Sequence, residues 1–123
     1  MTEYLKRFAH PLQMASGGTL PTFQVAYSTY GTLNSSRDNA VLVLHGLTSD
    51  QHASGTRPDS RPGWWENIIG PGKAVDTEHW YVVCPNSVGS WGGTSGPMTI
   101  NPETGRPWGL RFPMFTIGDN VPT

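Results

Sequence analysis

The stretch VLVLHGLTSD, residues 41–50, decides the fold of this chain. An apolar run rich in Val and Leu, Ala40 to Leu44, leads straight into His45 and Gly46. Such a run is typical of a strand in a sheet whose two faces are both covered. Gly46 allows the backbone to turn sharply and a ligand to approach closely. We therefore predict a buried strand that ends in a loop able to serve chemistry.

Two further strands are predicted on either side of this stretch. Residues 23–29 alternate between apolar and polar positions, which is the period-two pattern of a strand. Residues 80–84, WYVVC, form another apolar run, and residues 64–69, WWENII, predict a short helix between the strands. The order of strand, loop, short helix and strand indicates an α/β protein with a parallel or mixed sheet.

The rest of the chain is expected to be mostly loop. Residues 1–21 are weakly patterned, with a turn at Gly17 and Gly18. Residues 85–113 are rich in glycine and proline, and a loop of that length in a small domain is usually functional. Thr116 and Asp119 have the spacing of a helix start.

Composition narrows the function classes. The length of 123 residues fits one small domain, and the net charge of −1 without a basic run argues against nucleic acid or an anionic membrane as partner. One cysteine excludes an internal disulfide and favours the cytoplasm. The N-terminus lacks the apolar core of a secretory signal, and no apolar run approaches the ~20 residues of a spanning helix.

The backbone N–H that follows His45 and Gly46 is the main candidate for chemistry. An N–H beyond a sharp turn at the end of a strand can point into the cleft where α/β proteins bind ligands. It occupies the place of one oxyanion-hole donor in α/β-hydrolases. The alternative is a tight turn without chemistry.

Other reactive side chains are better explained structurally. We expect His45 to brace its turn, and His52 and His79 to be surface or loop residues. No His or Cys spacing fits a metal site, and Cys84 lies within an apolar strand as a small buried residue.

Neither Ser90 nor Ser95 fits the G-x-S-x-G elbow of a hydrolase nucleophile, and no helix is predicted after them, so both are read as loop residues. Trp64 and Trp65 are expected to anchor packing.

Three stretches together resemble the homoserine O-acetyltransferase family of α/β-hydrolase-fold enzymes, which includes serine and homoserine O-succinyltransferase relatives. The carrying motifs lie in residues 25–34, 39–55 and 63–117: VAYSTYGTLN, NAVLVLHGLTSDQHASG, and the segment from GWWENIIGPGKAVDT to GRPWGLRFPMFTI. The resemblance covers the chain from about Val25 onward. It implies that residues 1–123 are the N-terminal part of one α/β-hydrolase domain, with an incomplete central sheet.

The resemblance also implies an activity. Members transfer an acetyl or succinyl group from acyl-coenzyme A to the hydroxyl of homoserine or serine, in methionine or cysteine biosynthesis. Acyl-coenzyme A is a cosubstrate, and no bound cofactor or metal is implied. The Ser, Asp and His triad of the family lies later in the sequence, so the chain is expected to lack it and to be inactive alone.

One role can be placed on matching positions. Leu47 would give its backbone N–H to the oxyanion hole, and Thr48 and Ser49 would flank the substrate pocket. Gly46 stands where many members carry alanine, and Gly118 replaces the usual charged residue. Pro122 falls inside the helix expected there, which would fit a truncation point or an altered reading frame.

Two other readings remain open. The chain could be a non-catalytic relative with the hydrolase fold, or a binding and interaction module that keeps the loop-rich cleft. A sheet of about three strands would also leave edges open, and pairing of those edges between copies would give a homodimer.

Overall fold

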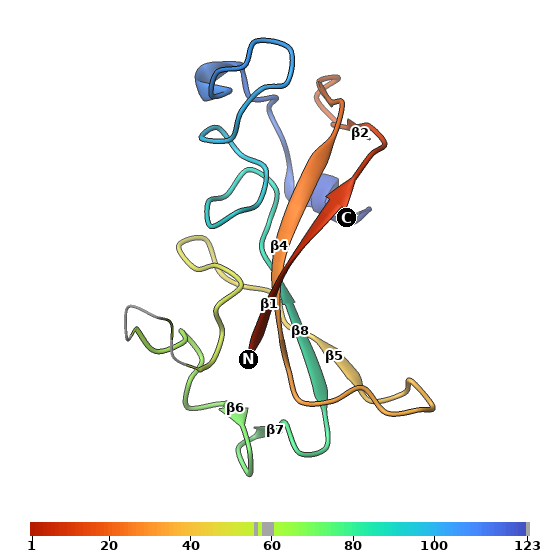
Figure 1. The fold of residues 1–123 in the computed structure, drawn as a ribbon, viewed down its shortest axis with the longest axis vertical. Coiled ribbons are helices and arrows are strands. Elements are labelled where there is room, and N and C mark those ends of the chain that lie inside the picture. The colour runs from red at the N-terminus through yellow and green to blue at the C-terminus, as the bar shows by residue number, and fades with distance from the viewer. Residues whose placement is uncertain (56, 58–60, 123) are drawn as a thin grey trace. The chain divides into compact units, whose positions relative to one another are not determined.

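The fold was analysed in a computed structural model, which describes residues 1–55, 57 and 61–122 (Figure 1). A four-stranded sheet has the strand order β1-β4-β8-β5. Two small two-stranded sheets pair β2 with β3 and β6 with β7. Among the described residues, no helix is long and apolar enough to cross a membrane.

The elements are short apart from two strands. They are β1 (Thr2–Phe8), β2 (Leu12–Gln13), β3 (Thr19–Leu20), β4 (Phe23–Tyr30), β5 (Ala40–Leu42), β6 (Ile69–Gly70), β7 (Val75–Asp76), β8 (Tyr81–Pro85) and the 3₁₀ helices η1 (Gly109–Arg111) and η2 (Ile117–Asn120).

The two predicted flanking strands are present. β4 covers residues 23–30 and pairs antiparallel with β8, with Ser28 opposite Cys84 and Tyr30 opposite Val82. β8 begins one residue later than predicted and runs to Pro85. β8 pairs on its other side with β5 in parallel, with Val41 opposite Val82. The sheet is therefore mixed, as the order of elements indicated.

The strand within residues 40–44 differs from the prediction of burial on both faces. β5 spans only Ala40–Leu42 and lies at the edge of the sheet. Val43 is buried, whereas Leu42 is 65% exposed and Leu44 70% exposed. Side chains alternate across a strand, so one face of β5 packs into the core and the other faces outward. A continuous apolar run could not distinguish this arrangement from full burial.

The first 21 residues contain strands that the weak pattern did not predict. β1 occupies residues 2–8, most of whose side chains are exposed, and for that reason it lacks a hydrophobic alternation. β2 and β3 form a small hairpin, with Leu12 opposite Leu20. The predicted turn is confirmed between them, where Gly17 has φ +93 and the Met14 N–H donates to the Gly18 carbonyl at 2.9 Å.

The chain divides into two compact units, and each is built from two separate stretches. Unit 1 consists of residues 1–4 and 27–85, and unit 2 of residues 5–26 and 86–123. Each unit has its own hydrophobic cluster of buried side chains. The expectation of one partial domain over residues 1–123 stays a prediction.

The core of unit 1 lies between the strands and the long connection from β5 to β8. The buried residues are Tyr30, Val43, Ala53, Ile69, Val82 and Cys84. Trp64 packs against this cluster, as predicted for an anchor, and its ring stacks on Trp65 at 5.4 Å. Residues 64–68 form successive turns, not the predicted helix, and Ile69 belongs to β6. Glycines at 70 and 72 with positive φ prevent the turns from continuing as a helix.

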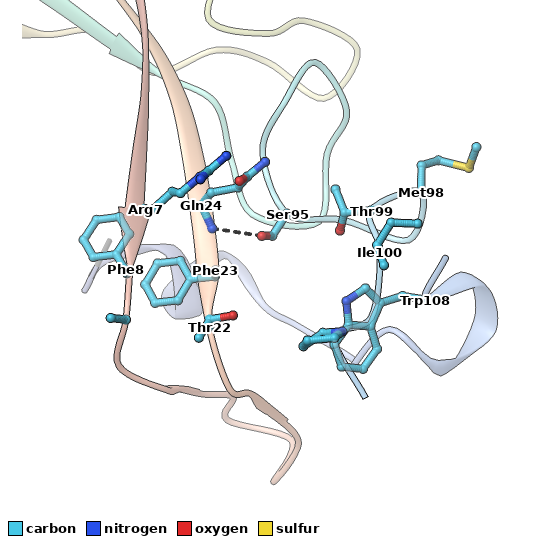
Figure 2. Close-up of a pocket in the computed structure, with 12 residues that line it drawn as sticks. Arg7, Phe8, Thr22, Phe23, Gln24, Ser95, Met98, Thr99, Ile100 and Trp108 are labelled. Atoms are coloured by element: carbon cyan, nitrogen blue, oxygen red, sulfur yellow. Dashed lines mark hydrogen bonds between the residues drawn. The ribbon is translucent and has the colours of Figure 1, made fainter. Parts of the chain in front are cut away.

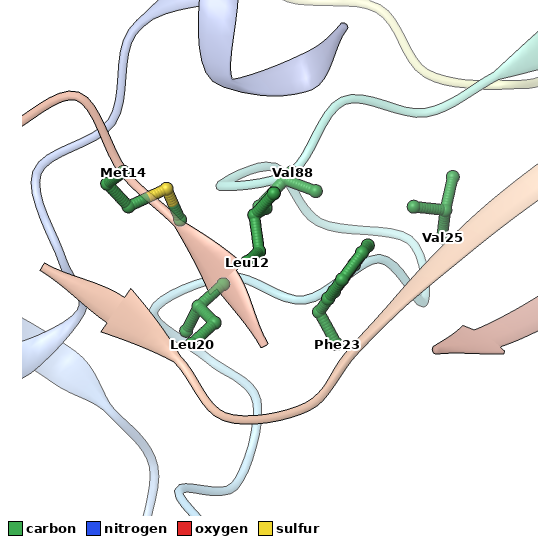
Figure 3. Close-up of a cluster of buried hydrophobic side chains, with 6 residues drawn as sticks. All are labelled: Leu12, Met14, Leu20, Phe23, Val25 and Val88. Carbon is green, nitrogen blue, oxygen red and sulfur yellow. The ribbon is translucent and has the colours of Figure 1, made fainter. Parts of the chain in front are cut away.

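The core of unit 2 gathers side chains from the hairpin, from β4 and from the long loop. Figure 3 shows its six buried residues, which are Leu12, Met14, Leu20, Phe23, Val25 and Val88. Phe8, Trp108 and Phe112 pack against them and are partly buried. The apolar side chains of the amino-terminal hairpin thus pack against side chains from distant parts of the sequence.

The predicted long loop is confirmed as a segment without regular strands from Asn86 to Trp108, apart from one bridge between Ile100 and Pro107. Polar side chains attach it to β4. The Thr94 hydroxyl accepts the Ala26 N–H at 2.9 Å, and the Ser95 hydroxyl accepts the Gln24 N–H at 2.9 Å. Both hydroxyls thereby stand in for backbone partners that a neighbouring strand would supply.

The predicted helix start at Thr116 is confirmed as a capping box. The Thr116 hydroxyl and the Asp119 carboxylate satisfy each other's backbone N–H groups at the start of η2. The helix that follows is a single 3₁₀ turn, and the described residues contain no α-helix. The helical content expected of an α/β chain is therefore limited to η1 and η2 in this part of the sequence.

Candidate active-site turn

The turn at residues 45–49 follows β5 after Val43 and Leu44. The Ser49 N–H donates to the Gly46 carbonyl at 3.1 Å, and Nδ1 of His45 lies 2.8 Å from the same oxygen. His45 therefore braces its turn, as predicted. Leu47 is 97% exposed, so the apex of the turn is open on the surface of unit 1.

The turn has the position at which α/β proteins bind ligands. β5 and β8 are parallel, so their carboxyl ends lie at the same edge of the sheet. Ligands of such sheets bind beyond the carboxyl ends of the strands. Leu47 and Thr48 form the exposed part of the turn, and Ser49 is half-buried at its end. The structure thus brings the three predicted residues together, and the oxyanion role of Leu47 stays a prediction.

Asp50, immediately after the turn, is a buried charged residue that sequence reasoning missed. Oδ1 of its carboxylate accepts the His52 N–H at 2.9 Å, and Oδ2 forms an ion pair with the Arg57 guanidinium. Its backbone carbonyl accepts the indole N–H of Trp64 at 2.9 Å. The one signal in the sequence for such a role of Asp50 was its place between the predicted catalytic turn and Arg57, seven positions later.

The surroundings of Asp50 keep it ionised. Burial acts to raise the pKa of its carboxyl, but hydrogen bonds from the His52 N–H and from Arg57, together with the charge of Arg57, outweigh burial. The net effect is a pKa below the ordinary value of an aspartate. A buried carboxylate with a charged partner and a backbone donor is a rigid acceptor at neutral pH.

Tyr30 fixes the segment that follows Asp50. Its phenolic oxygen accepts the N–H groups of Ala53 at 2.9 Å and Ser54 at 3.1 Å, and its hydroxyl donates to the Gln51 carbonyl at 3.3 Å. Burial is the main cause that raises the pKa of Tyr30, so the phenol stays protonated at neutral pH. The hydroxyl of one strand residue therefore adds to the backbone hydrogen bonds that hold this loop.

The prediction that His52 is a surface or loop side chain is wrong with respect to its exposure. His52 lies in a loop but is buried, with Nδ1 3.0 Å from the Met1 sulfur and Nε2 3.2 Å from the Arg61 carbonyl. Its burial depends on the amino-terminal residue and on the loop after residue 60, which the local pattern does not reveal. His79 is exposed, as predicted, and its Nδ1 lies 3.1 Å from the Asp76 carboxylate.

Cys84 behaves as the small buried residue that the sequence predicted. It is fully buried, and burial together with the nearby Asp50 charge raises the pKa of its thiol to about 12. A thiol with that pKa is not a nucleophile at neutral pH. Within the described ranges, no group of three or more His, Cys, Asp or Glu side chains could hold a metal ion.

The two serines considered as nucleophiles are loop residues, as predicted. Ser95 is buried with its hydroxyl on the Gln24 N–H, and the Ser90 N–H donates to the Ser87 carbonyl at 3.2 Å. Neither serine lies between a strand and a helix, since no α-helix occurs in the described part of the chain. A hydroxyl that accepts a structural hydrogen bond in a loop is not presented for attack on a substrate.

Unit 2 contains a cavity of about 700 Å³, which opens beside the carboxyl end of β1 and the beginning of β4. Figure 2 shows the rings of Phe8 and Phe23 along one side, with centroids 4.4 Å apart and nearly parallel planes. Trp108 and Ile100 come from the long loop on the other side. The lining suits an apolar group, and it contains no acid or base pair for chemistry among its described residues.

Comparison with known sequences finds relatives that match most of this chain. The chain is 52% identical over 118 residues to a homoserine O-succinyltransferase of Acidithiobacillus ferrooxidans, and the match covers 94% of this chain. It is 54% identical over 114 residues, or 92% of this chain, to a homoserine O-acetyltransferase of Methanosphaerula palustris. This chain is a homologue of the homoserine O-acyltransferases. It spans 31% of the length of the first relative and 23% of the second.

Solved structures also match most of this chain. The structure of homoserine O-acetyltransferase from Bacillus anthracis matches 97% of this chain with a TM-score of 0.79 and 35% identity, over 34% of its own length. Esterase E22 matches 98% of this chain with a TM-score of 0.87 and 34% identity, over 35% of its length. No family model matches the chain. This homoserine O-acyltransferase homologue therefore has part of an α/β-hydrolase fold. The part corresponds to about a third of the length of the matched structures.

Proposed function

We propose that this chain forms the oxyanion-turn region of an enzyme that transfers an acetyl or succinyl group from acyl-coenzyme A to homoserine or serine in the cytoplasm. The observation that carries the proposal is the exposed turn with Leu47 at its apex, at the carboxyl end of β5 and beside the parallel strand β8. About 50% identity to named homoserine O-acyltransferases supports the choice of reaction.

The proposed reaction has two acyl-transfer steps. A serine oxygen attacks the thioester carbonyl, the new C–O bond replaces the C–S bond, and coenzyme A leaves as its thiol. The homoserine hydroxyl then attacks the acyl-serine, and the serine recovers its proton. In both steps the carbonyl oxygen becomes negative, and the Leu47 N–H would donate a hydrogen bond to it.

The serine and its catalytic histidine and aspartate are not assigned to this chain. The serines weighed above serve as loop residues, and the matched relatives are about three times as long as the aligned part. We therefore place the triad in the part of such an enzyme that lies outside the alignment. Residues 1–123 alone are expected to show no acyl-coenzyme A turnover.

A chimera tests the proposal directly. This chain would replace the matching 118 residues of the Acidithiobacillus ferrooxidans relative, and O-acylhomoserine formation would be measured. We expect the chimera to be active and Leu47→Pro, which removes the backbone N–H, to lower kcat by about 10²–10³-fold. Leu47→Ala keeps the N–H and is the matched control, with kcat close to that of the chimera.

Several outcomes would contradict the proposal. An active chimera that keeps its kcat with Leu47→Pro would exclude Leu47 as an oxyanion donor. A folded chimera that binds acyl-coenzyme A without turnover would favour a non-catalytic relative or a binding module. A chimera that neither folds nor binds would show that this chain does not fit the enzyme it resembles.

Ester hydrolysis is the second candidate function, and the similarity to esterase E22 favours it. An esterase and an acyltransferase share the oxyanion hole and the acyl-enzyme, and they differ in whether water or homoserine accepts the acyl group. Measuring acetate and O-acetylhomoserine in parallel separates the two. Acetate release that is unaffected by homoserine would favour the esterase.

A further inference from the structure

An oxyanion donor has to be held within about 0.5 Å of its working position, so the contacts that fix the turn at residues 45–49 bear on its proposed role. Gly46, Leu47 and Thr48 are all exposed. The hydrogen bond between Ser49 and Gly46 closes the turn on itself and does not attach it to the rest of the unit. The position of the Leu47 N–H therefore depends on the residues at which the chain enters and leaves the turn.

The entry is fixed by the sheet. The Val43 N–H donates to the Val83 carbonyl at 2.9 Å, just after the last paired residue of β5. Val43 is also buried in the core of unit 1. The backbone leading into His45 is thus held by a hydrogen bond and by packing.

The exit is fixed by Asp50, which is held at both its side chain and its backbone. The carboxylate binds the His52 N–H through Oδ1 and the Arg57 guanidinium through Oδ2. The backbone carbonyl accepts the Trp64 indole N–H at 2.9 Å, and the Cys84 thiol lies 4.0 Å from the same oxygen. Asp50 is therefore the first residue after the turn that cannot move without breaking several hydrogen bonds.

We propose that Asp50 is the positioning residue of the oxyanion turn and that its ion pair with Arg57 holds the Leu47 N–H in place. The inference rests on the proposed function for its catalytic consequence. Asp50 does not touch the reacting atoms in this proposal, and it acts only through the backbone between Ser49 and Leu47. Loss of the pair would lower kcat and leave KM for both substrates unchanged, because substrate binding does not use the oxyanion donor before the transition state.

Asp76 provides a matched control in the same unit. Its carboxylate also accepts two backbone N–H groups, from Gly72 at 2.9 Å and Glu78 at 3.0 Å, and it lies 3.1 Å from the ring of His79. The turn that Asp76 holds precedes β8 and is separate in sequence from residues 45–49. Asp50→Asn and Asp76→Asn therefore remove the same charge from carboxylates that accept backbone N–H groups, and only the first affects the exit of the turn.

The first measurement uses the 123-residue chain and does not depend on activity. Amide chemical shifts and backbone order parameters of residues 46–49 are compared by NMR for the unsubstituted chain, Asp50→Asn and Asp76→Asn. We expect Asp50→Asn to shift these signals and lower their order parameters, and Asp76→Asn to leave them unchanged. Unchanged turn signals in a folded Asp50→Asn chain would overturn the positioning role.

The second measurement uses the chimera with the Acidithiobacillus ferrooxidans relative. Asp50→Asn is expected to lower kcat by about 10- to 100-fold with KM unchanged, the effect typical of a donor displaced by about 1 Å. Asp76→Asn is expected to keep the kcat of the parent chimera. An equal kcat for Asp50→Asn and the parent would overturn the inference even if Leu47→Pro is inactive.

A third variant tests the same ion pair if Asp50→Asn does not fold. Arg57→Gln removes the ion pair from the other partner and leaves the Asp50 carboxylate on the His52 N–H. It is expected to reproduce the shifted turn signals and the loss of kcat, and normal turn signals and kcat would overturn the role of the pair. If the parent chimera is inactive, the proposed function fails, and the NMR comparison still decides whether Asp50 fixes the turn.

Discussion

The hydroxyl of Tyr30 and the backbone N–H of Ala53 form a hydrogen bond of 2.9 Å between a central strand and the loop after the turn, across 23 residues of sequence. The same oxygen accepts the Ser54 N–H at 3.1 Å. These two N–H groups lie in the buried core of unit 1, where water cannot replace the phenol. The hydroxyl is therefore a structural group whose removal has a defined cost.

Tyr30→Phe is expected to destabilise the chain by about 1–3 kcal/mol, because it removes the acceptor of the buried Ser54 N–H and leaves the Ala53 N–H with the Gln51 carbonyl alone. Urea unfolding followed by fluorescence gives the free energy of unfolding. The control is Tyr27→Phe, since the Tyr27 ring is half-buried and stacks on Tyr4 at 5.1 Å. Equal stability of the two variants would mean that the Tyr30 hydroxyl contributes no more than a surface phenol.

Replacing two glycines of unit 1 by alanine should change the stability of the chain to different extents. A Cβ at Gly63 would lie 2.3 Å from the Ala53 carbonyl oxygen and 2.3 Å from the Ser54 Cα, both of them backbone atoms that cannot move aside alone. At Gly46 a Cβ would meet nothing within 4 Å. We expect Gly63→Ala to cost about 1–3 kcal/mol of stability and Gly46→Ala to be within about 0.5 kcal/mol of the parent. Thermal unfolding of both variants checks the contrast, and a destabilised Gly46→Ala would contradict the open geometry of the turn.

The hydrogen bonds of Asp119 predict that the stability of unit 2 falls at acid pH. Hydrogen bonds from the Thr116 N–H and then the Ala15 N–H lower the pKa of its carboxyl below the ordinary value. Because the folded-state pKa is the lower one, this stabilisation is fully present above the unfolded pKa of about 4 and is lost as the pH falls through the folded pKa. Unfolding midpoints between neutral pH and pH 2 should fall less steeply for Asp119→Asn than for the parent.

Glu103→Gln is the matched control for this acid dependence, because Glu103 is an exposed carboxylate of the same unit. It is expected to show the pH dependence of the parent. The same slope for Asp119→Asn and the parent would show that Asp119 does not contribute to the acid sensitivity.

Cys84 should resist thiol reagents as long as unit 1 is folded. A thiol with a pKa of about 12 and no exposed surface offers almost no thiolate near pH 8. Reaction with iodoacetamide, followed by mass spectrometry, is expected to be slow in buffer and stoichiometric after addition of urea. Rapid and complete modification of the folded chain would contradict the burial of this strand.

The sequence predicted the parts of the fold in which the local pattern and the tertiary environment agree. β4 and β8 were found because both carry apolar residues into the core of the sheet. The capping box at Thr116 was found because a cap depends on residues only three positions apart. The turn at Leu47 was found because His45 and Gly46 follow an apolar run in the sequence.

Other parts depended on partners far away in sequence. β1 has mostly exposed side chains, so its residues carry no periodic signal for a strand. The helix predicted at Trp64 is replaced by turns, because its residues are used to cover the core and to bind the Asp50 carbonyl. For Asp50 the sequence offers only the spacing to Arg57, and the contacts with Arg57 and Trp64 that define its role arise only in the folded chain.

The division of the chain into two units has a consequence for attempts to isolate either one. Unit 1 takes residues 1–4 and 27–85, and unit 2 takes residues 5–26 and 86–123, so their segments are interleaved along the polypeptide. No single cleavage of the backbone can release one whole unit free of residues that belong to the other. A single cut after residue 85 leaves unit 1 whole but joined to residues 5–26 of unit 2, and any gene fragment that encodes all of one unit also encodes part of the other.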